Sequence, residues 1–213
     1  MSAAPLLLVA HGSADPRFAQ VVEGIAAAVR RLAPELDVRI GYLDHGPPDV
    51  ADVAEAGAIA VPLLLAAGYH VRIDLPEQAP DVAVADAIGP DPGLADVLAD
   101  RLGEAGYDGR SPVTLAAAGS ADERARADVE IARKQLADRL GVAVDVAFVA
   151  AGEPRLADVR PRVVATYLLA PGKFADAVTT CGASVSSAPI GVHPLVAKVV
   201  LDRYSRLRTA GDH

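Results

Sequence analysis

The chain has 213 residues, a formal net charge of −8 and a single cysteine, and 52% of its residues are hydrophobic, with no tryptophan. One cysteine excludes an internal disulfide framework and is typical of a reducing compartment. The acidic balance argues against nucleic acid as a partner, and no apolar run approaches the roughly 18 residues of a membrane span. Because the apolar start at residues 5–10 is too short for a signal peptide, we expect a cytoplasmic protein with no membrane partner.

The first half of the chain alternates short apolar runs with helical patterns. A helix is expected over Ala19–Leu32, after the capping sequence SADP at residues 13–16. The apolar runs are nearly continuous, as is typical of strands covered on both faces. They predict strands at Leu6–Ala10, Val38–Leu43, Ala58–Leu65 and Val82–Ala85.

The second half has the same alternation. A helix is expected over Glu123–Leu140, where opposite charges four residues apart indicate a solvated outer face. Strands are expected at Val113–Ala117, Ala143–Val149, Val163–Leu169 and Ser184–Ala188. The turn-forming stretch GYDGRSP at 106–112 predicts the boundary between the halves. The predicted fold is α/β, with two tandem lobes at residues 1–106 and 112–208, each a four-stranded parallel sheet flanked by helices.

The two halves are copies of one sequence. LLLVAHGSAD at 6–15 matches VTLAAAGSAD at 113–122, and PLLLAAGYH at 62–70 matches TYLLAPGKF at 166–174. The residue-number offset falls from 107 at His11–Ala118 to 102 at Ile88–Ile190, which corresponds to short loop deletions. A period of half the chain indicates domain duplication, because solenoid repeats are much shorter.

Three consecutive strands of the first copy end in groups that can bind metal. His11 follows the first predicted strand, Asp44 and His45 follow the second, and His70 follows the third. The carboxyl ends of parallel strands meet at one edge of the sheet, which is where ligands gather in open α/β folds. Imidazole and carboxylate together suit divalent first-row metals, and a site with two or three protein ligands leaves the metal exchangeable.

The second copy separates function from structure. Ala118 stands where the first copy has His11, and Phe174 stands where it has His70. A structural histidine would be needed in both copies, so we interpret His11 and His70 as a functional pair. Asp44 is replaced by Ala150, but an aspartate is also common in turns.

The remaining histidines and the serine after His11 favour structural roles. His45 is interpreted as structural or peripheral, His193 as a helix cap because it matches Asp91 before a proline, and His213 as a residue of the terminus. Ser13 persists as Ser120 in the copy without histidine and lacks the G-x-S-x-G pattern, so it is a cap and not a nucleophile.

Three segments together resemble the class II chelatases, the sirohydrochlorin cobaltochelatases and ferrochelatases of cobalamin and sirohaem synthesis. They are LLLVAHGSADPRF at the start, GYLDHGPPDV in the middle and VPLLLAAGYHVRIDLP after it. The resemblance implies a lyase that inserts Co²⁺ or Fe²⁺, with Ni²⁺ as a further candidate, and that needs no organic cofactor or ATP. It also implies two lobes around a cleft, with His11 and His70 as catalytic metal ligands. The family often has glutamate where Asp44 stands, so the shorter Asp44 is a candidate third ligand.

An anionic tetrapyrrole needs cationic or N–H partners. The candidates are Ser13 with the N–H groups after Gly12, Arg17, Arg72 and Lys173. The degenerate second lobe would form the other wall of the cleft, and fusion of two copies favours a monomer. The rival hypothesis is a carrier that binds metal or tetrapyrrole without catalysis.

Overall fold

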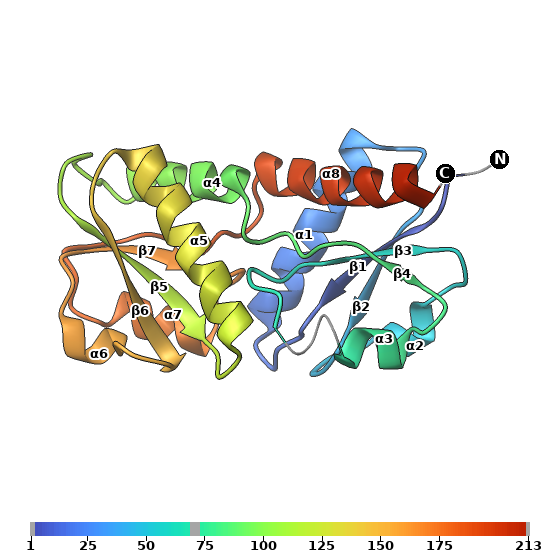
Figure 1. Ribbon diagram of the computed structural model, residues 1–213, viewed down its shortest axis with the longest axis horizontal. Coiled ribbons are helices and arrows are strands. Elements are labelled where there is room, and N and C mark those ends of the chain that lie inside the picture. The colour runs from blue at the N-terminus through green and yellow to red at the C-terminus, as the bar shows by residue number, and fades with distance from the viewer. Residues whose placement is uncertain (1–2, 69–72, 212–213) are drawn as a thin grey trace. The chain divides into compact units, whose positions relative to one another are not determined.

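The computed structural model describes residues 3–68 and 73–211 and divides into two compact units (Figure 1). Unit 1 comprises residues 1–88 together with 192–213, and unit 2 comprises residues 89–191. Within the described ranges, no helix is both long and apolar enough to cross a membrane.

Unit 1 is built on a four-stranded parallel sheet in the order β2-β1-β3-β4. Its strands are β1 (Leu6–Ala10), β2 (Val38–Tyr42), β3 (Ile59–Pro62) and β4 (Ala83–Val84). Every side chain of β1 is buried, as its continuous apolar sequence predicts. The helices of this unit are α1 (Pro16–Leu32), α2 (Val50–Val53), α3 (Leu75–Gln78) and α8 (Pro194–Gly211).

Unit 2 repeats this topology in the order β6-β5-β7-β8, again with parallel pairing throughout. Its strands are β5 (Val113–Gly119), β6 (Val144–Ala151), β7 (Val163–Tyr167) and β8 (Val185–Ser186). Its helices are α4 (Pro92–Glu104), α5 (Glu123–Leu140), α6 (Leu156–Val159) and α7 (Lys173–Thr179). The predicted fold class and the duplication are confirmed.

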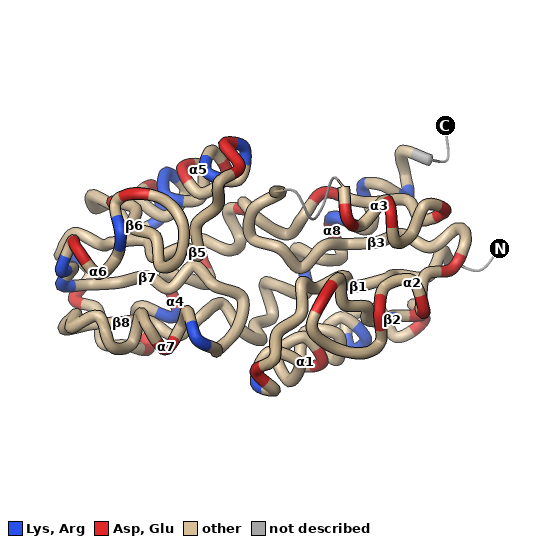
Figure 2. Tube along the Cα trace, turned by 90° about the horizontal axis from the view of Figure 1, so that it is seen from below, with Lys and Arg blue, Asp and Glu red and all other residues tan. Residues whose placement is uncertain are grey.

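Helix α5 has the solvated face that its charge pattern predicts. Acidic and basic residues are interleaved along it in Figure 2. Arg133 Nε lies 2.8 Å from Glu130 Oε2, and Arg126 lies 3.8 Å from Glu123. The two residues of each pair are three positions apart along the helix. A short exposed contact of this kind stabilises a helix only slightly.

The third strand is shorter than predicted, ending at Pro62 and not at Leu65. Its last paired residue in the ladder with β1 is Pro62, opposite Val9. One residue beyond Val9, β1 also ends, and the chain then turns at Gly12, whose φ is +96°. An apolar run therefore extends past the point where a neighbouring strand can pair with it.

The last helix of each copy lies in the unit formed by the other copy, which corrects the predicted lobes at 1–106 and 112–208. Helix α8 packs on α1 and β3 in unit 1, whereas α4 packs on α5 and β7 in unit 2. The GYDGRSP turn at 106–112 is present, with Tyr107 Oη donating to Ser111 O at 2.6 Å. It connects α4 to β5 inside unit 2 and therefore does not separate the units.

A repeated arginine fixes each exchanged helix. Arg101 of α4 donates from Nε and Nη2 to the carbonyl of Ile190, at 3.3 and 3.2 Å. Arg203 of α8 donates from Nε to the carbonyl of Ala87 at 3.0 Å. Both carbonyls follow the fourth strand of the sheet against which the helix packs. The Asp-Arg pair that survives in both copies is thus structural.

Replacement of Arg203 by alanine should lower the free energy of unfolding by about 1–3 kcal/mol, because it leaves the Ala87 carbonyl without its buried donor. Urea denaturation measures the change. Arg206→Ala is the matched control on the same helix, since Arg206 is 70% exposed and pairs with the surface residue Asp202. That control should change stability by less than about 0.5 kcal/mol. Equal losses in both variants would contradict the role assigned to Arg203.

Candidate functional site

The candidate site lies at the carboxyl end of β1, where two loops of unit 1 are held together by their backbones. Asp44 N donates to His11 O at 2.9 Å, continuing the pairing of Leu43 N with Ala10 O. Gly12 lies so close to the Asp44 carbonyl that a Cβ at this position would be 1.6 Å from the oxygen. Only glycine allows both this approach and the positive φ. The first and second strand ends are therefore fixed to each other, as predicted from the topology.

The same contact occurs in unit 2 without the histidines. A Cβ on Gly119 would lie 1.7 Å from the carbonyl oxygen of Ala151. The bridges Tyr42–Asp49 and Phe148–Arg155 fix the correspondence of the two loops. When the two loops are aligned through these bridges, Ala151 corresponds to His45. Gly119 therefore approaches the carbonyl of a residue one position later in the loop than the residue that Gly12 approaches. The ladder between β5 and β6 is irregular at this point, between Ala117 and Gly119.

His45, for which a structural or peripheral role was expected, lies beside His11. The centroids of the two imidazole rings are 6.4 Å apart. His45 adopts a left-handed conformation with φ +49°. The Asp44 carboxylate contacts both the backbone and the ring of His45. Oδ1 accepts from His45 N at 2.8 Å, and Oδ2 lies 3.2 Å from His45 Nε2. A sequence signal existed, because His45 is replaced by Ala151 in the second copy.

Two of the predicted site residues, His70 and Arg72, lie outside the described residues. Within residues 3–68 and 73–211, no group of three or more His, Cys, Asp or Glu side chains is arranged to hold a metal ion. Phe174, which replaces His70 in the second copy, is on α7 of unit 2 and is 40% exposed. The described part of the site is thus His11, Asp44 and His45.

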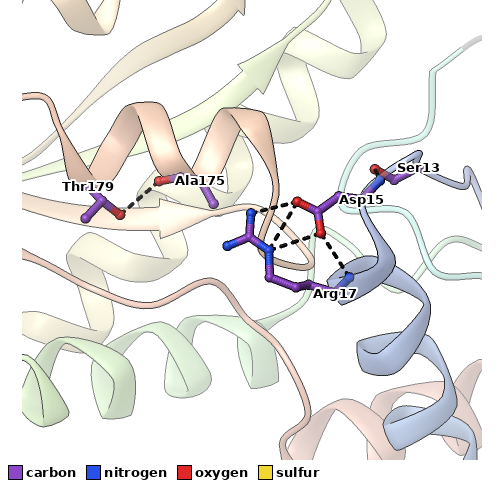
Figure 3. Close-up of polar contacts among 5 residues, drawn as sticks. All are labelled: Ser13, Asp15, Arg17, Ala175 and Thr179. Atoms are coloured by element: carbon purple, nitrogen blue, oxygen red, sulfur yellow. Dashed lines mark hydrogen bonds and ion pairs between the residues drawn. The ribbon is translucent and has the colours of Figure 1, made fainter.

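The predicted anion-binding residues Ser13 and Arg17 form a local network with Asp15 (Figure 3). Ser13 Oγ accepts from Asp15 N at 3.1 Å, and Asp15 caps α1 by accepting from Arg17 N at 2.9 Å. The N-cap is therefore Asp15, and Ser13 supports it from two residues earlier. Arg17 folds back so that Nη2 lies 2.6 Å from Asp15 Oδ2. Hydrogen bonds from the side chain and backbone of Arg17 lower the pKa of Asp15 below its ordinary value.

The corresponding turn of unit 2 shows which parts of this network are structural. Ser120 Oγ accepts from Asp122 N at 3.0 Å, and Asp122 accepts from Arg124 N at 2.9 Å. The serine and the aspartate thus build the same helix start in both copies. Lys173 is the exposed first residue of α7 in unit 2, the helix in which Thr179 Oγ1 donates to Ala175 O at 3.1 Å (Figure 3).

The structural role predicted for His193 is confirmed. Its Nδ1 accepts from Leu195 N at 3.2 Å at the start of α8. Asp91 Oδ1 accepts from Gly93 N at 2.8 Å at the start of α4. The two residues satisfy equivalent N–H groups at the starts of equivalent helices.

A surface cavity of about 530 Å³ occurs in unit 2. Its polar lining includes Glu130 and Arg133, which pair with each other, and Arg133 also donates to Val144 O. These groups bind one another and are not directed at a ligand. The cavity adds no chemistry to the site.

Sequence comparison shows the family of the chain. The family model described as CbiX matches residues 5–105, which is the first of the two copies. A sirohydrochlorin cobaltochelatase of Sulfolobus acidocaldarius is 32% identical over 113 residues, covering 47% of this chain and 90% of the relative. A sirohydrochlorin ferrochelatase of Priestia megaterium is 30% identical over 173 residues, covering 71% of this chain and 64% of the relative.

Solved structures share the fold over nearly the whole chain. SirB from Bacillus subtilis with Fe³⁺ superimposes with a TM-score of 0.79 at 20% identity, covering 98% of this chain and 96% of that one. CbiX, described as the terminal enzyme for siroheme biosynthesis in denitrifying bacteria, has a TM-score of 0.75 at 25% identity, covering 95% and 98%. The fold is therefore that of the two-unit chelatases. The chain belongs to the CbiX family.

Replacement of Gly12 by alanine should separate the two loops that carry His11 and Asp44, because the new Cβ would overlap the Asp44 carbonyl. We expect a loss of more than about 3 kcal/mol in the free energy of unfolding, measured by urea denaturation. Gly57→Ala is the matched control, since Gly57 also has a positive φ but has open space where a Cβ would lie, with no atom within 4 Å. Its loss should be about 1–2 kcal/mol, from conformational strain alone. Equal losses would show that the close approach is unimportant.

Proposed function

We propose that this protein is a sirohydrochlorin chelatase, a lyase that inserts a divalent metal into the tetrapyrrole. The observation that carries the proposal is the grouping of His11, Asp44 and His45 at one strand edge of unit 1. This grouping lies in the copy that the CbiX model matches, and the second copy lacks it. The relatives from two different organisms are both named for chelation of sirohydrochlorin.

The reaction that this site would support is an exchange of protons for metal. Two pyrrole N–H bonds break, the macrocycle nitrogens bind M²⁺, and two protons leave, so no oxidant or reductant is needed. Histidine suits both halves of the exchange because imidazole transfers protons near neutral pH and binds first-row metals when neutral. In this proposal His11 is the principal proton acceptor and a transient metal ligand. His70 is its partner in this proposal. The sequence alone places His70 after the third strand.

The proposal needs no organic cofactor and no nucleotide, and the metal is a substrate. Co²⁺ and Fe²⁺ are the expected metals, with Ni²⁺ as a further candidate. Histidine and carboxylate ligands bind these ions in an order that the metals themselves determine, so cellular supply selects among them. Orientation of metal and macrocycle in one site supplies the remaining rate enhancement.

The carboxylates of the tetrapyrrole would be bound by cationic side chains and backbone N–H groups. Arg17 is a candidate whose Nε and Nη2 are already directed at the Asp15 carboxylate. To bind a substrate carboxylate, Arg17 would have to exchange this bidentate contact for one of the same kind. Arg72, Lys173 and Ser13 stay predictions for the same role.

His11→Ala should reduce turnover of sirohydrochlorin with Co²⁺ by at least about 100-fold, since general base and ligand are lost together. The assay follows the visible spectrum of the tetrapyrrole under anaerobic conditions, and circular dichroism checks that the variant folds. Phe174→Ala is the control, since Phe174 takes the place of His70 in the copy without the site. It should leave the KM for Co²⁺ unchanged, even where it alters stability or tetrapyrrole affinity. Turnover of His11→Ala at the wild-type rate would refute the mechanism.

The same assay distinguishes the enzyme from a carrier. A carrier changes the spectrum in proportion to the protein added and then stops. An enzyme converts many equivalents of tetrapyrrole. Single-turnover behaviour of the wild-type protein with Co²⁺, Fe²⁺ and Ni²⁺ would therefore overturn the proposed function.

A further inference from the structure

The outer edge of the unit 2 sheet is open at the middle of β6. In a parallel strand, the backbone N–H and C=O of one residue point to the same side, and the side alternates from residue to residue. Val144 O accepts from Arg133 Nη1 at 3.2 Å, so this residue points away from β5. Phe148 also points away, because its N–H donates to Pro154 O at 2.9 Å. Val146 lies between them and points the same way, and no described residue pairs with its backbone N–H or C=O. Such groups on an edge strand are a template for another strand.

This open edge lines the unit 2 cavity of about 530 Å³. Val146 and Phe148 contribute apolar surface from the strand, Pro154 contributes it from the following loop, and Val159 contributes it from α6. Val159 is 40% exposed, so an added segment would remove apolar surface from water. The cavity thus has the two features that strand addition uses, which are unpaired backbone groups and apolar contacts for alternate side chains.

The charged groups of the cavity leave an excess of negative charge. Glu130 and Arg133 neutralise each other in an ion pair, with Arg133 Nε 2.8 Å from Glu130 Oε2. Asp145 and Glu153 are exposed, and neither forms an ion pair with any residue that the structure describes. Two unpaired carboxylates beside an apolar surface suit a ligand that carries both a cation and apolar groups.

The equivalent edge of unit 1 is occupied by the protein itself. When the copies are aligned through their matching bridges, Arg39 of β2 stands where β6 has Asp145. Arg39 Nη1 lies 2.6 Å from Glu55 Oε2, which comes from the five-residue loop at 54–58 between α2 and β3. The corresponding loop of unit 2, at 160–162, has three residues and no carboxylate. The loss of this ion pair accompanies the open edge in unit 2.

The charge at this edge determines what can pair with it. A second copy of β6 would bring another Asp145 to the same edge, and like charges opposed across two strands are destabilising. Acidic side chains on an edge strand therefore oppose association of the protein with itself. A segment that carries a basic residue is attracted by the same carboxylates.

We propose that the open edge of β6 is a docking site for an extended segment of a partner protein, in which an arginine or lysine stands between β-branched residues. The backbone of the segment pairs with the N–H and C=O of Val146. Its cation binds Asp145, and the two flanking side chains, which point to the opposite face, contact Phe148. This interaction is separate from metal insertion and uses residues of unit 2 alone.

The test is binding of a fluorescein-labelled peptide, Thr-Val-Arg-Val-Thr, to the full-length protein, measured by fluorescence anisotropy. We expect saturable binding, and the peptide Thr-Val-Gln-Val-Thr should bind at least about 10-fold more weakly because it lacks the cation. In NMR spectra of the wild-type protein, the basic peptide should shift the Val146 amide and slow its exchange with solvent. An unchanged Val146 amide at about 1 mM peptide would overturn the proposal without any variant.

Asp145→Arg places the unit 1 residue at this position and should raise the Kd of the basic peptide by at least about 10-fold. The matched control is Asp138→Arg, which makes the same change of charge at an exposed position of α5 that does not line the cavity. It should bind the peptide as the wild-type protein does, apart from a small effect of net charge that added salt removes. Equal Kd values for the wild-type protein and Asp145→Arg, or equal losses in the two variants, would contradict docking at β6.

Discussion

The contact between Gly12 and the Asp44 carbonyl fixes the relative positions of the first two strand ends of unit 1. It joins the end of the central strand to the end of its neighbour, at a distance that no side chain would permit. His11 precedes this glycine directly and His45 follows the carbonyl residue directly, so one backbone contact places both imidazoles. Unit 2 keeps the contact at Gly119 and lacks the side chains. The contact is therefore part of the fold, and only in unit 1 do two histidines and an aspartate flank it.

Most of the fold could be predicted because its determinants are local and occur twice. The apolar strands, the capping aspartates before α1 and α5, and the prolines before the last helices are visible in the sequence. The exchange of the last helices could not be predicted. Both α4 and α8 begin at a proline and carry an Asp-Arg pair, so either helix could satisfy either sheet. Repetition shows what is duplicated but not which copy a segment packs against.

The site was predictable to a similar degree. Topology and the mismatch between copies identified His11 and Asp44, which the structure brings together. The placement of His45 beside His11 could not be predicted, because a histidine beside an aspartate in a turn has no periodic signal. Its position depends on a left-handed residue that no sequence pattern specifies. The comparison of the two copies that singled out His11 applies equally to His45, because the second copy has Ala151 in its place.

The net charge of the molecule has opposite effects on the two substrates. A net charge of −8 attracts a divalent cation and repels a tetrapyrrole that carries carboxylates. The anion requires specific cationic partners, and the candidate Arg17 is paired with Asp15. Arg17 would have to leave the Asp15 carboxylate, which its Nε and Nη2 both contact, before it could bind a carboxylate of the substrate.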